Sequence, residues 1–190
     1  MAKCFDVVGY VEPCNAVRQK YTGRALLITG TNDNTPIQIT FSDNGMEVSQ
    51  IGGVNNLTEL SNLEKFPLSI NAENPFGVTV QGNTDSGRVM YTKTIPVSLP
   101  ATRDGKAEEF IMGLQKGLNT AMIVLEPFGG TAYGDVFGAY SPVRIDPTSV
   151  TRNEYENGSA WTFNIVCDEP VPNVIFSIEG LSETLDALNA

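Results

Sequence analysis

Two acidic residues near the centre of the C-terminal half form a candidate pair for acid–base chemistry. Glu154 and Glu156 are two positions apart, so an extended strand would point both from one face. Hydrolysis of a glycosidic bond uses two carboxylates about 5 to 10 Å apart. Asn157-Gly158 follows directly, however, and this dipeptide is typical of an exposed hairpin tip. We expect these carboxylates at a solvated turn and keep a carboxylate-based hydrolase only as a third hypothesis.

Other polar side chains offer oxygen ligands or an aromatic platform. Asp33 and Asp43 lie among asparagines and could supply oxygens to Ca²⁺, but their spacing does not match a calcium-binding loop. Asx residues at such places are equally typical of turns. Trp161 and Tyr140 could stack on a sugar ring, yet Trp161 begins an alternating apolar set that is typical of a core strand. We predict no metal site and no cofactor site from these residues.

The absence of histidine from the sequence narrows the chemistry further. It excludes a Ser-His-Asp triad, a Cys-His pair and a histidine-ligated metal. The three cysteines, Cys4, Cys14 and Cys167, show no CxxC spacing of the kind that zinc sites use. Cys167 falls on the apolar face of a predicted strand, and we expect all three to be free thiols. The sequence therefore predicts no catalytic residues and a protein that is not an enzyme.

Charge and hydropathy indicate the kind of partner. The 190 residues include 12 Lys and Arg against 22 Asp and Glu, for a net charge of −10. Tight binding to nucleic acid needs a basic surface, so DNA or RNA is not expected as a tightly held ligand. The N-terminus shows no signal-peptide pattern, and no stretch approaches the ~20 apolar residues of a membrane helix. We expect a protein made in a reducing cytoplasm, with no membrane partner.

Alternation of apolar and polar residues predicts mostly β-strands. Ile37, Ile39 and Phe41 share one face, and Ser42 to Gly45 supplies a tight turn into a partner strand, which indicates a hairpin. A continuous apolar run from 120 to 126 predicts a buried central strand. Further strands are predicted over 24–30, 76–82, 88–99, 133–140, 161–167 and 174–178.

One internal segment has a helical period instead. Between 104 and 119, apolar residues recur at steps of three and four, which places one apolar stripe along an α-helix. The chain therefore predicts a mainly β fold, an antiparallel β-sandwich or barrel with one packed α-helix near 104–119. We expect a single domain over 1–180, with a long loop about 55–74, an extended arm about 141–157, and a C-terminal helix or tail over 181–190.

The order of these elements carries a family resemblance. The residues that carry it are Tyr133, Val136, Phe137 and Gly138, then Tyr155, Asn157, Gly158, Trp161, Phe163 and Ile165. This arrangement over about 105–167 resembles phage tail and neck structural proteins of the tail-tube-like type, including those of phages that infect Bacteroidetes-type hosts. The resemblance implies a tail-tube-like sandwich whose copies lie side by side, their sheets forming a ring around a channel.

The expected function follows from that resemblance. We expect a virion structural protein, a ring- or tube-forming subunit of a phage tail, neck or connector, whose partners are its own copies, adjacent virion proteins and passing DNA. The net charge of −10 agrees with an acidic lumen that does not hold DNA. The alternative is a β-sandwich binding module for carbohydrate or protein. The residues expected at subunit interfaces are Asn55, Leu57, Leu60, Leu63, Phe66, Tyr140, Val143, Ile145, Val150, Tyr155, Leu181, Leu185 and Leu188.

Overall fold

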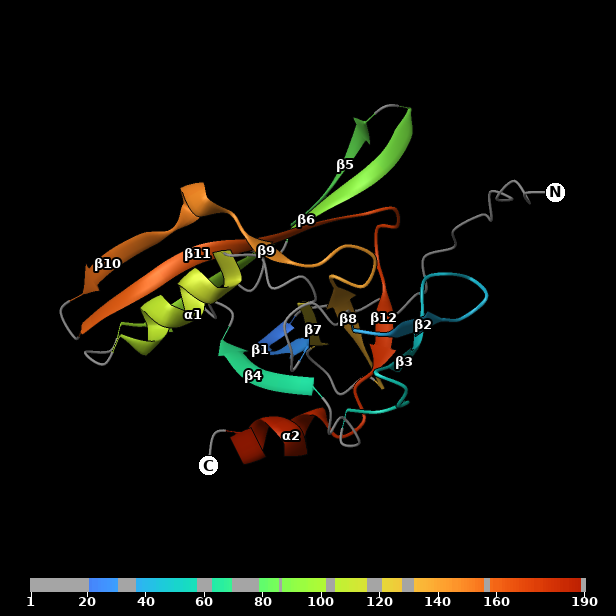
Figure 1. Cartoon of the computed structure of the whole chain (residues 1–190), viewed down its shortest axis with the longest axis horizontal. Coiled ribbons are helices and arrows are strands. Elements are labelled where there is room, and N and C mark those ends of the chain that lie inside the picture. Colours follow the sequence, from blue (N-terminus) through green and yellow to red (C-terminus); the bar gives the residue numbers. More distant parts are fainter. Residues whose placement is uncertain are drawn as a thin grey trace, which may run out of the picture.

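A computed structural model describes residues 21–30, 37–57, 63–69, 79–85, 87–101, 105–115, 121–127, 132–155 and 158–188 (Figure 1). Over these residues the chain is mainly β, with antiparallel sheets and two α-helices. In chain order the elements are β1 (Tyr21–Gly30), β2 (Ile39–Phe41), β3 (Val48–Ile51), β4 (Leu63–Ser69), β5 (Thr79–Asp85), β6 (Arg88–Pro100), α1 (Lys106–Gln115), β7 (Met122–Pro127), β8 (Tyr133–Phe137), β9 (Arg144–Ile145), the 3-10 turn η1 (Pro147–Ser149), β10 (Thr151–Tyr155), β11 (Gly158–Glu169), β12 (Ile175–Ser177) and α2 (Leu181–Leu188).

The strands form two larger sheets and one separate hairpin. Sheet I has the order β12-β8-β7-β1-β4. Sheet II has the order β10-β11-β6-β5, and β9 pairs with β11 beside β10. Every pair of strands in these sheets is antiparallel, and β2 pairs with β3 as the predicted hairpin. The expected fold class, an antiparallel β-sandwich-like fold with a packed helix, is confirmed.

An inner core fills the space between the two sheets and α1. Sheet II contributes the alternating residues that were predicted for it, among them Phe163 and Ile165, and sheet I contributes Leu27 and Ile123. The predicted helix is present as α1, and its apolar stripe adds Ile111 and Leu114 to this core. Because each of these side chains is almost fully buried, the inner core is a major source of hydrophobic stabilisation.

A second core covers the opposite face of sheet I. Leu26 and Met122, which alternate with the inner-core residues of the same strands, pack there against Val48 of β3 and Leu185 of α2. Sheet I is thus covered on both faces, which explains why its central strands β1 and β7 are apolar on both sides. The C-terminal segment that could have been a tail is the helix α2, and its leucines belong to this second core.

Two segments differ from their predicted irregular form. Part of the loop expected over 55–74 is strand β4, which pairs with β1 from Arg24 opposite Ser69 to Gly30 opposite Leu63. Its sequence lacks alternation and contains Pro67, which an edge strand tolerates because one side has no ladder to join. Part of the arm expected over 141–157 runs along β11 as β9, η1 and β10, so backbone pairing holds it against sheet II.

Among the described residues, no helix is long and apolar enough to cross a membrane. Cys4, Cys14 and the predicted calcium ligand Asp33 lie outside the described residues, as does the start of the strand predicted over 76–82. Cys167 is a buried free thiol, as expected. Burial, followed by the nearby negative charge of Glu169, raises the pKa of this thiol to about 12.

Candidate functional site

No element of the described chain covers the outer face of sheet II, and we call this the polar face. Strand β6 alternates, so Ile95 and Val97 point into the inner core while Thr94 and Ser98 point away from it. The register places Thr162 of β11 opposite Ser98 and so extends this face across the sheet. No described residue of the polar face is buried. Its members with described side chains are Thr79, Gln81, Asn83, Arg88, Met90, Thr92, Thr94, Pro96, Ser98, Pro100, Arg144, Thr151, Asn153, Ala160, Thr162, Asn164, Val166 and Asp168.

Hydrogen bonds between side chains join neighbouring strands across the polar face. Asn83 Nδ2 donates to Thr92 Oγ1 at 2.9 Å, and that hydroxyl donates to Asp168 Oδ1 at 2.7 Å. Arg144 donates to the other oxygen of Asp168 at 2.8 Å. The hydrogen bond from Arg144, then that from Thr92, lowers the pKa of Asp168 below its usual value. The acidic group within this network is therefore ionised and paired.

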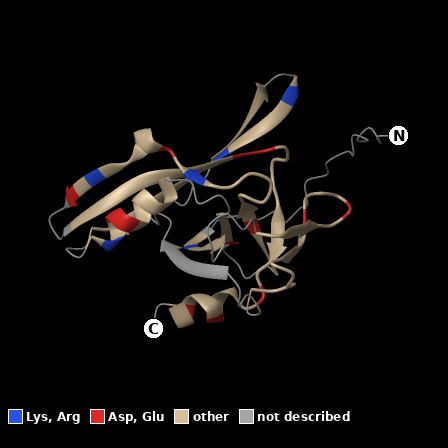
Figure 2. Cartoon of the chain, in the orientation of Figure 1, with Lys and Arg blue, Asp and Glu red and all other residues tan. Residues whose placement is uncertain are grey.

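The polar face is nearly neutral, although the whole chain is strongly acidic. Its charged residues with described side chains are Arg88, Arg144 and Asp168, and the last two pair with each other. Most of the remaining side chains are threonine, serine, asparagine and glutamine. Figure 2 shows acidic residues on α1, on α2, in the loop between β2 and β3, and towards the ends of β10 and β11. The face can therefore offer many weak hydrogen-bonding groups without a strong electrostatic field.

Strands β5 and β10 are the two edges of sheet II in the part of the chain that the structure describes. β5 pairs with β6 on one side, and β10 pairs with β11 on one side. An edge strand presents N–H and C=O groups that can pair with another chain, and natural proteins usually block such edges with lysine, proline or a bulge. The sequence of β5, TVQGNTD, contains neither lysine nor proline. It is suited to strand addition.

The β5–β6 hairpin extends away from the body of the molecule (Figure 1). Val80 is 46% exposed and Val89 is 55% exposed. The register places both valines on the same side of sheet II as Lys93, Ile95 and Val97, whose side chains are buried. At the hairpin, this side of the sheet is exposed. Gly82 lies opposite Tyr91, where a Cβ at Gly82 would contact the tyrosine ring at 3.5 Å. The hairpin therefore carries an exposed apolar surface next to the free edge of β5.

A buried ion pair joins sheet II to the turn that follows β8. The side chains of Lys93 and Glu169 both have 0% exposure, and their Nζ and Oε2 atoms are hydrogen bonded. Glu169 Oε1 accepts backbone hydrogen bonds from Gly138 at 3.0 Å, Ala139 at 2.8 Å and Tyr140 at 3.3 Å. The Lys93 ammonium also lies 5.1 Å from the centre of the Phe137 ring. Removing one partner of such a buried pair leaves an uncompensated charge.

The sequence contained a signal for this pair that the predictions missed. Lys93 occupies an inward position in the predicted 88–99 strand, between Tyr91 and Ile95, and Glu169 continues the alternation that includes Cys167. Charged residues are almost never fully buried without a partner. Two charges of opposite sign at apolar positions of neighbouring strands therefore indicate a buried pair, provided that the strand register is known.

Tyr140 attaches the β2–β3 hairpin to the same turn. Its ring stacks on Phe41, with centroids 4.3 Å apart and an interplanar angle of 18°, and its hydroxyl donates to the Gly45 carbonyl. The Ile175 N–H adds a 2.9 Å hydrogen bond to the Met46 carbonyl. Tyr140 is 40% exposed, but its polar group is engaged by the hairpin.

Among the described residues, the candidate chemical side chains are not brought together. Glu154 is exposed on β10, and Glu156 lies outside the described residues. Trp161 is half-buried against the inner core, and its indole N–H donates to Glu108 of α1 at 2.9 Å. It therefore anchors the helix and offers no open sugar platform. Asp43 is exposed in the β2–β3 turn, where Asn44 Oδ1 accepts backbone hydrogen bonds from Met46 and Glu47.

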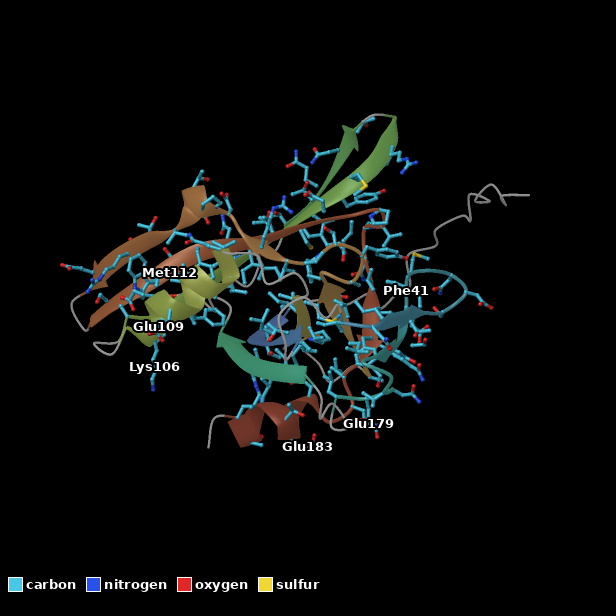
Figure 3. The ribbon with its side chains drawn as sticks, viewed as in Figure 1. Phe41, Lys106, Glu109, Met112, Glu179 and Glu183 are labelled. Atoms are coloured by element: carbon cyan, nitrogen blue, oxygen red, sulfur yellow. The ribbon has the colours of Figure 1, made fainter. Side chains whose placement is uncertain are left out.

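A shallow cavity of about 420 Å³ lies at the start of α2. Glu126, Glu179 and Glu183 are among its lining residues, and the last two are labelled in Figure 3. Glu126 accepts a 2.6 Å hydrogen bond from the Thr22 hydroxyl. No group of three or more His, Cys, Asp or Glu side chains in the described part of the chain could hold a metal ion. The cavity therefore supports no cation site.

Five of the predicted interface residues are buried in the chain's own cores: Leu57, Val143, Ile145, Leu181 and Leu185. Asn55, Tyr140 and Leu188 are exposed, and Val150 packs partly against the inner core. Leu60 lies outside the described residues, as do the side chains of Leu63, Phe66 and Tyr155, whose backbones belong to β4 and β10.

Comparison with protein-family models, with curated protein sequences and with solved structures finds no match to this chain. The likeness to phage tail proteins thus rests on the sequence pattern alone.

Proposed function

We propose that this chain is a non-enzymatic virion structural protein whose copies form a ring or tube in a phage tail or neck, through which DNA passes. The observation that carries the proposal is the form of sheet II, which within the described residues has two unpaired edges and one polar face that no other element covers. A sheet of this kind can continue from copy to copy while its inner face stays packed on each subunit's own core.

Strand direction supports a head-to-tail contact. β10, β11, β6 and β5 alternate in direction across sheet II. In a ring, all copies keep the same orientation about the axis, so β5 of one copy would meet β10 of the next in antiparallel orientation. Each subunit would use two different surfaces, and the contact would close by rotation. The exposed valines beside the β5 edge would lose solvent contact in the same step.

The polar face would then line the channel. DNA binding strengthens with each phosphate that a Lys or Arg neutralises, and this face has few unpaired cations. Its hydroxyl and amide groups can be solvated while a duplex passes without being held. We therefore propose a nearly neutral channel lining in place of the acidic lumen that the net charge suggested. Adjacent virion proteins would contact the ends of the ring.

The test is the oligomeric state of the full chain, measured by size-exclusion chromatography with light scattering and by negative-stain electron microscopy. We expect rings or short tubes whose abundance increases with protein concentration. Val80→Lys places a charge beside the β5 edge and should leave a folded monomer. Met112→Lys is the matched control, because Met112 is 50% exposed and lies on α1 (Figure 3).

Two results would contradict the proposal at different levels. A wild-type chain that stays monomeric at every accessible concentration, and that instead retains glycans on an array, would replace the ring subunit with the binding-module alternative. If rings persist in Val80→Lys but disappear in Met112→Lys, the chain self-assembles, but through an interface on α1 and not through β5.

A further inference from the structure

The buried pair of Lys93 and Glu169 has the arrangement of an amine beside an acyl group. Both side chains are fully shielded from solvent, and they come from neighbouring strands of sheet II. The register places Lys93 opposite Cys167, two residues before Glu169, so the amine and the carboxyl share one face of the sheet. The Phe137 ring lies 5.1 Å from the amine nitrogen.

We propose that Lys93 and Glu169 condense to an intramolecular amide, joining Nζ of the lysine to Cδ of the glutamate. The driving force lies in the environment. Two charges buried without water carry a large desolvation cost, whereas an amide carries no net charge. The amide oxygen would remain on the three backbone N–H groups that already bind Glu169 Oε1, so its hydrogen bonds are formed in advance.

The reaction balances without any other reactant. A proton first moves from the Lys93 ammonium to Glu169 Oε2 along their hydrogen bond, which gives a neutral amine and a carboxylic acid. The nitrogen lone pair then forms the N–C bond at Cδ, and the electron pair of the C=O bond moves onto Oε1. As the C=O bond re-forms, the C–Oε2 bond breaks. The hydroxyl group departs with a proton from the nitrogen as one molecule of water.

The backbone N–H groups of residues 138–140 have a defined role in this step. They donate to the oxygen on which negative charge would develop, at 3.0, 2.8 and 3.3 Å. Fixed donors aimed at a developing oxyanion lower the barrier of acyl transfer. A desolvated lysine is also a stronger nucleophile than a solvated one. The turn after β8 would thus act as an oxyanion-binding loop, a role that is independent of the proposed ring.

Intact-protein mass spectrometry of the denatured full chain tests the proposal. We expect a mass lower by one water molecule than the sequence requires, and a proteolytic peptide that joins Lys93 to Glu169. Trypsin should fail to cut after Lys93. Glu169→Gln offers the same acyl carbon with a different leaving group, so this variant should lose one ammonia molecule where the natural chain loses water.

Lys93→Arg is the control, because arginine retains the charge but cannot form this amide. The mass of this variant should equal the mass that its sequence requires. Loss of water at another place, such as Asp104-Gly105, would still occur in this variant, so the control separates it from amide formation. A natural chain that is folded by circular dichroism and has its full sequence mass would overturn the proposal and leave an ion pair. So would a loss of water that persists in Lys93→Arg.

Discussion

Two glycines, one near the start of β8 and one directly after its end, control how closely this strand and its following turn approach β7. Gly134 lies where a Cβ would be 2.6 Å from the Leu125 carbonyl oxygen and 2.5 Å from a methyl carbon of Ile178. Gly138 has a φ of +92°, and its Cβ would be 2.8 Å from the Ala121 carbonyl oxygen. Such distances leave no room for a methyl group without movement of the backbone. These two glycines therefore allow β8 and its following turn to pack against β7.

Replacement of Gly134 by alanine should destabilise the chain by about 2 to 3 kcal/mol, because the added methyl group overpacks a site bounded by backbone. Gly113→Ala is the matched control: it lies in α1 with nothing near its Cβ position, and it should stabilise the chain by about 1 kcal/mol. Urea unfolding measures both. Equal effects of the two substitutions would contradict the packing of β8.

The pairing of Asp168 predicts a pH dependence. Its pKa is lowered in the folded chain by the hydrogen bonds from Arg144 and Thr92, so its stabilising contribution is present above the usual aspartate pKa of about 3.9. That contribution is lost as the pH falls through the lower, folded-state value. Asp168→Asn should therefore reduce the free energy of unfolding at neutral pH and have less effect in acid.

The size of this effect is limited by exposure. The Asp168 side chain is 37% exposed and that of Arg144 is 53% exposed, so we expect the difference at neutral pH to stay below about 1 kcal/mol. Thermal unfolding of both proteins across acid and neutral pH measures it. A difference that grows as the pH falls would contradict the sign derived from the pairing.

At the scale of the element, the β2–β3 hairpin is attached to the rest of the described chain by few contacts besides its cover of the second core. The Tyr140 hydroxyl donates to the Gly45 carbonyl, the Ile175 N–H donates to the Met46 carbonyl, and the Phe41 ring stacks on Tyr140. Elements with few attachments open more readily than the rest of a fold. A change at Tyr140 should therefore increase local opening of the hairpin more than opening of the two larger sheets.

Tyr140→Phe retains the stack on Phe41 and removes the hydrogen bond to Gly45, so it should cost about 0.5 to 1.5 kcal/mol. Hydrogen exchange followed by mass spectrometry should show faster exchange in peptides that contain β2 and β3, with β6 and β11 unchanged. Uniformly faster exchange throughout the chain would indicate that the contact stabilises the whole fold instead.

At the scale of the whole molecule, assembly and stability should be linked. A partner that binds only the folded chain raises its melting temperature in proportion to the logarithm of its concentration. If copies pair through β5 and β10, the melting temperature of the natural chain should increase with protein concentration. Differential scanning fluorimetry over a dilution series measures it, and Val80→Lys should show no such increase.

The near neutrality of the polar face gives a second prediction at this scale. Thr94→Lys with Ser98→Lys adds cations to an uncovered surface, so duplex DNA should bind this variant with a strong dependence on salt. The natural chain should show weak retention in the same gel-shift titration. Equal, tight binding by both proteins would contradict a channel lining that does not hold DNA.

The local sequence pattern was sufficient for much of the fold. A continuous apolar run predicted β1, a long extended stretch predicted β6 and alternation predicted β11. A helical period predicted α1, and the turn residues before Met46 predicted the hairpin of β2 and β3. These features depend on side-chain periodicity and on turn chemistry, which act over a few residues. They also defined Cys167 as a buried residue of a core strand.

The remaining features depend on tertiary structure, because contacts between residues far apart in the sequence outweighed the local preference for a strand, helix or loop. β4 is a strand because β1 supplies its hydrogen bonds, and Leu181 and Leu185 are buried because sheet I lies beneath α2. Lys93 and Glu169 meet across 76 positions only once β6 and β11 are in register. A sequence shows which residues alternate, but only the packing of layers shows which face of a sheet remains uncovered.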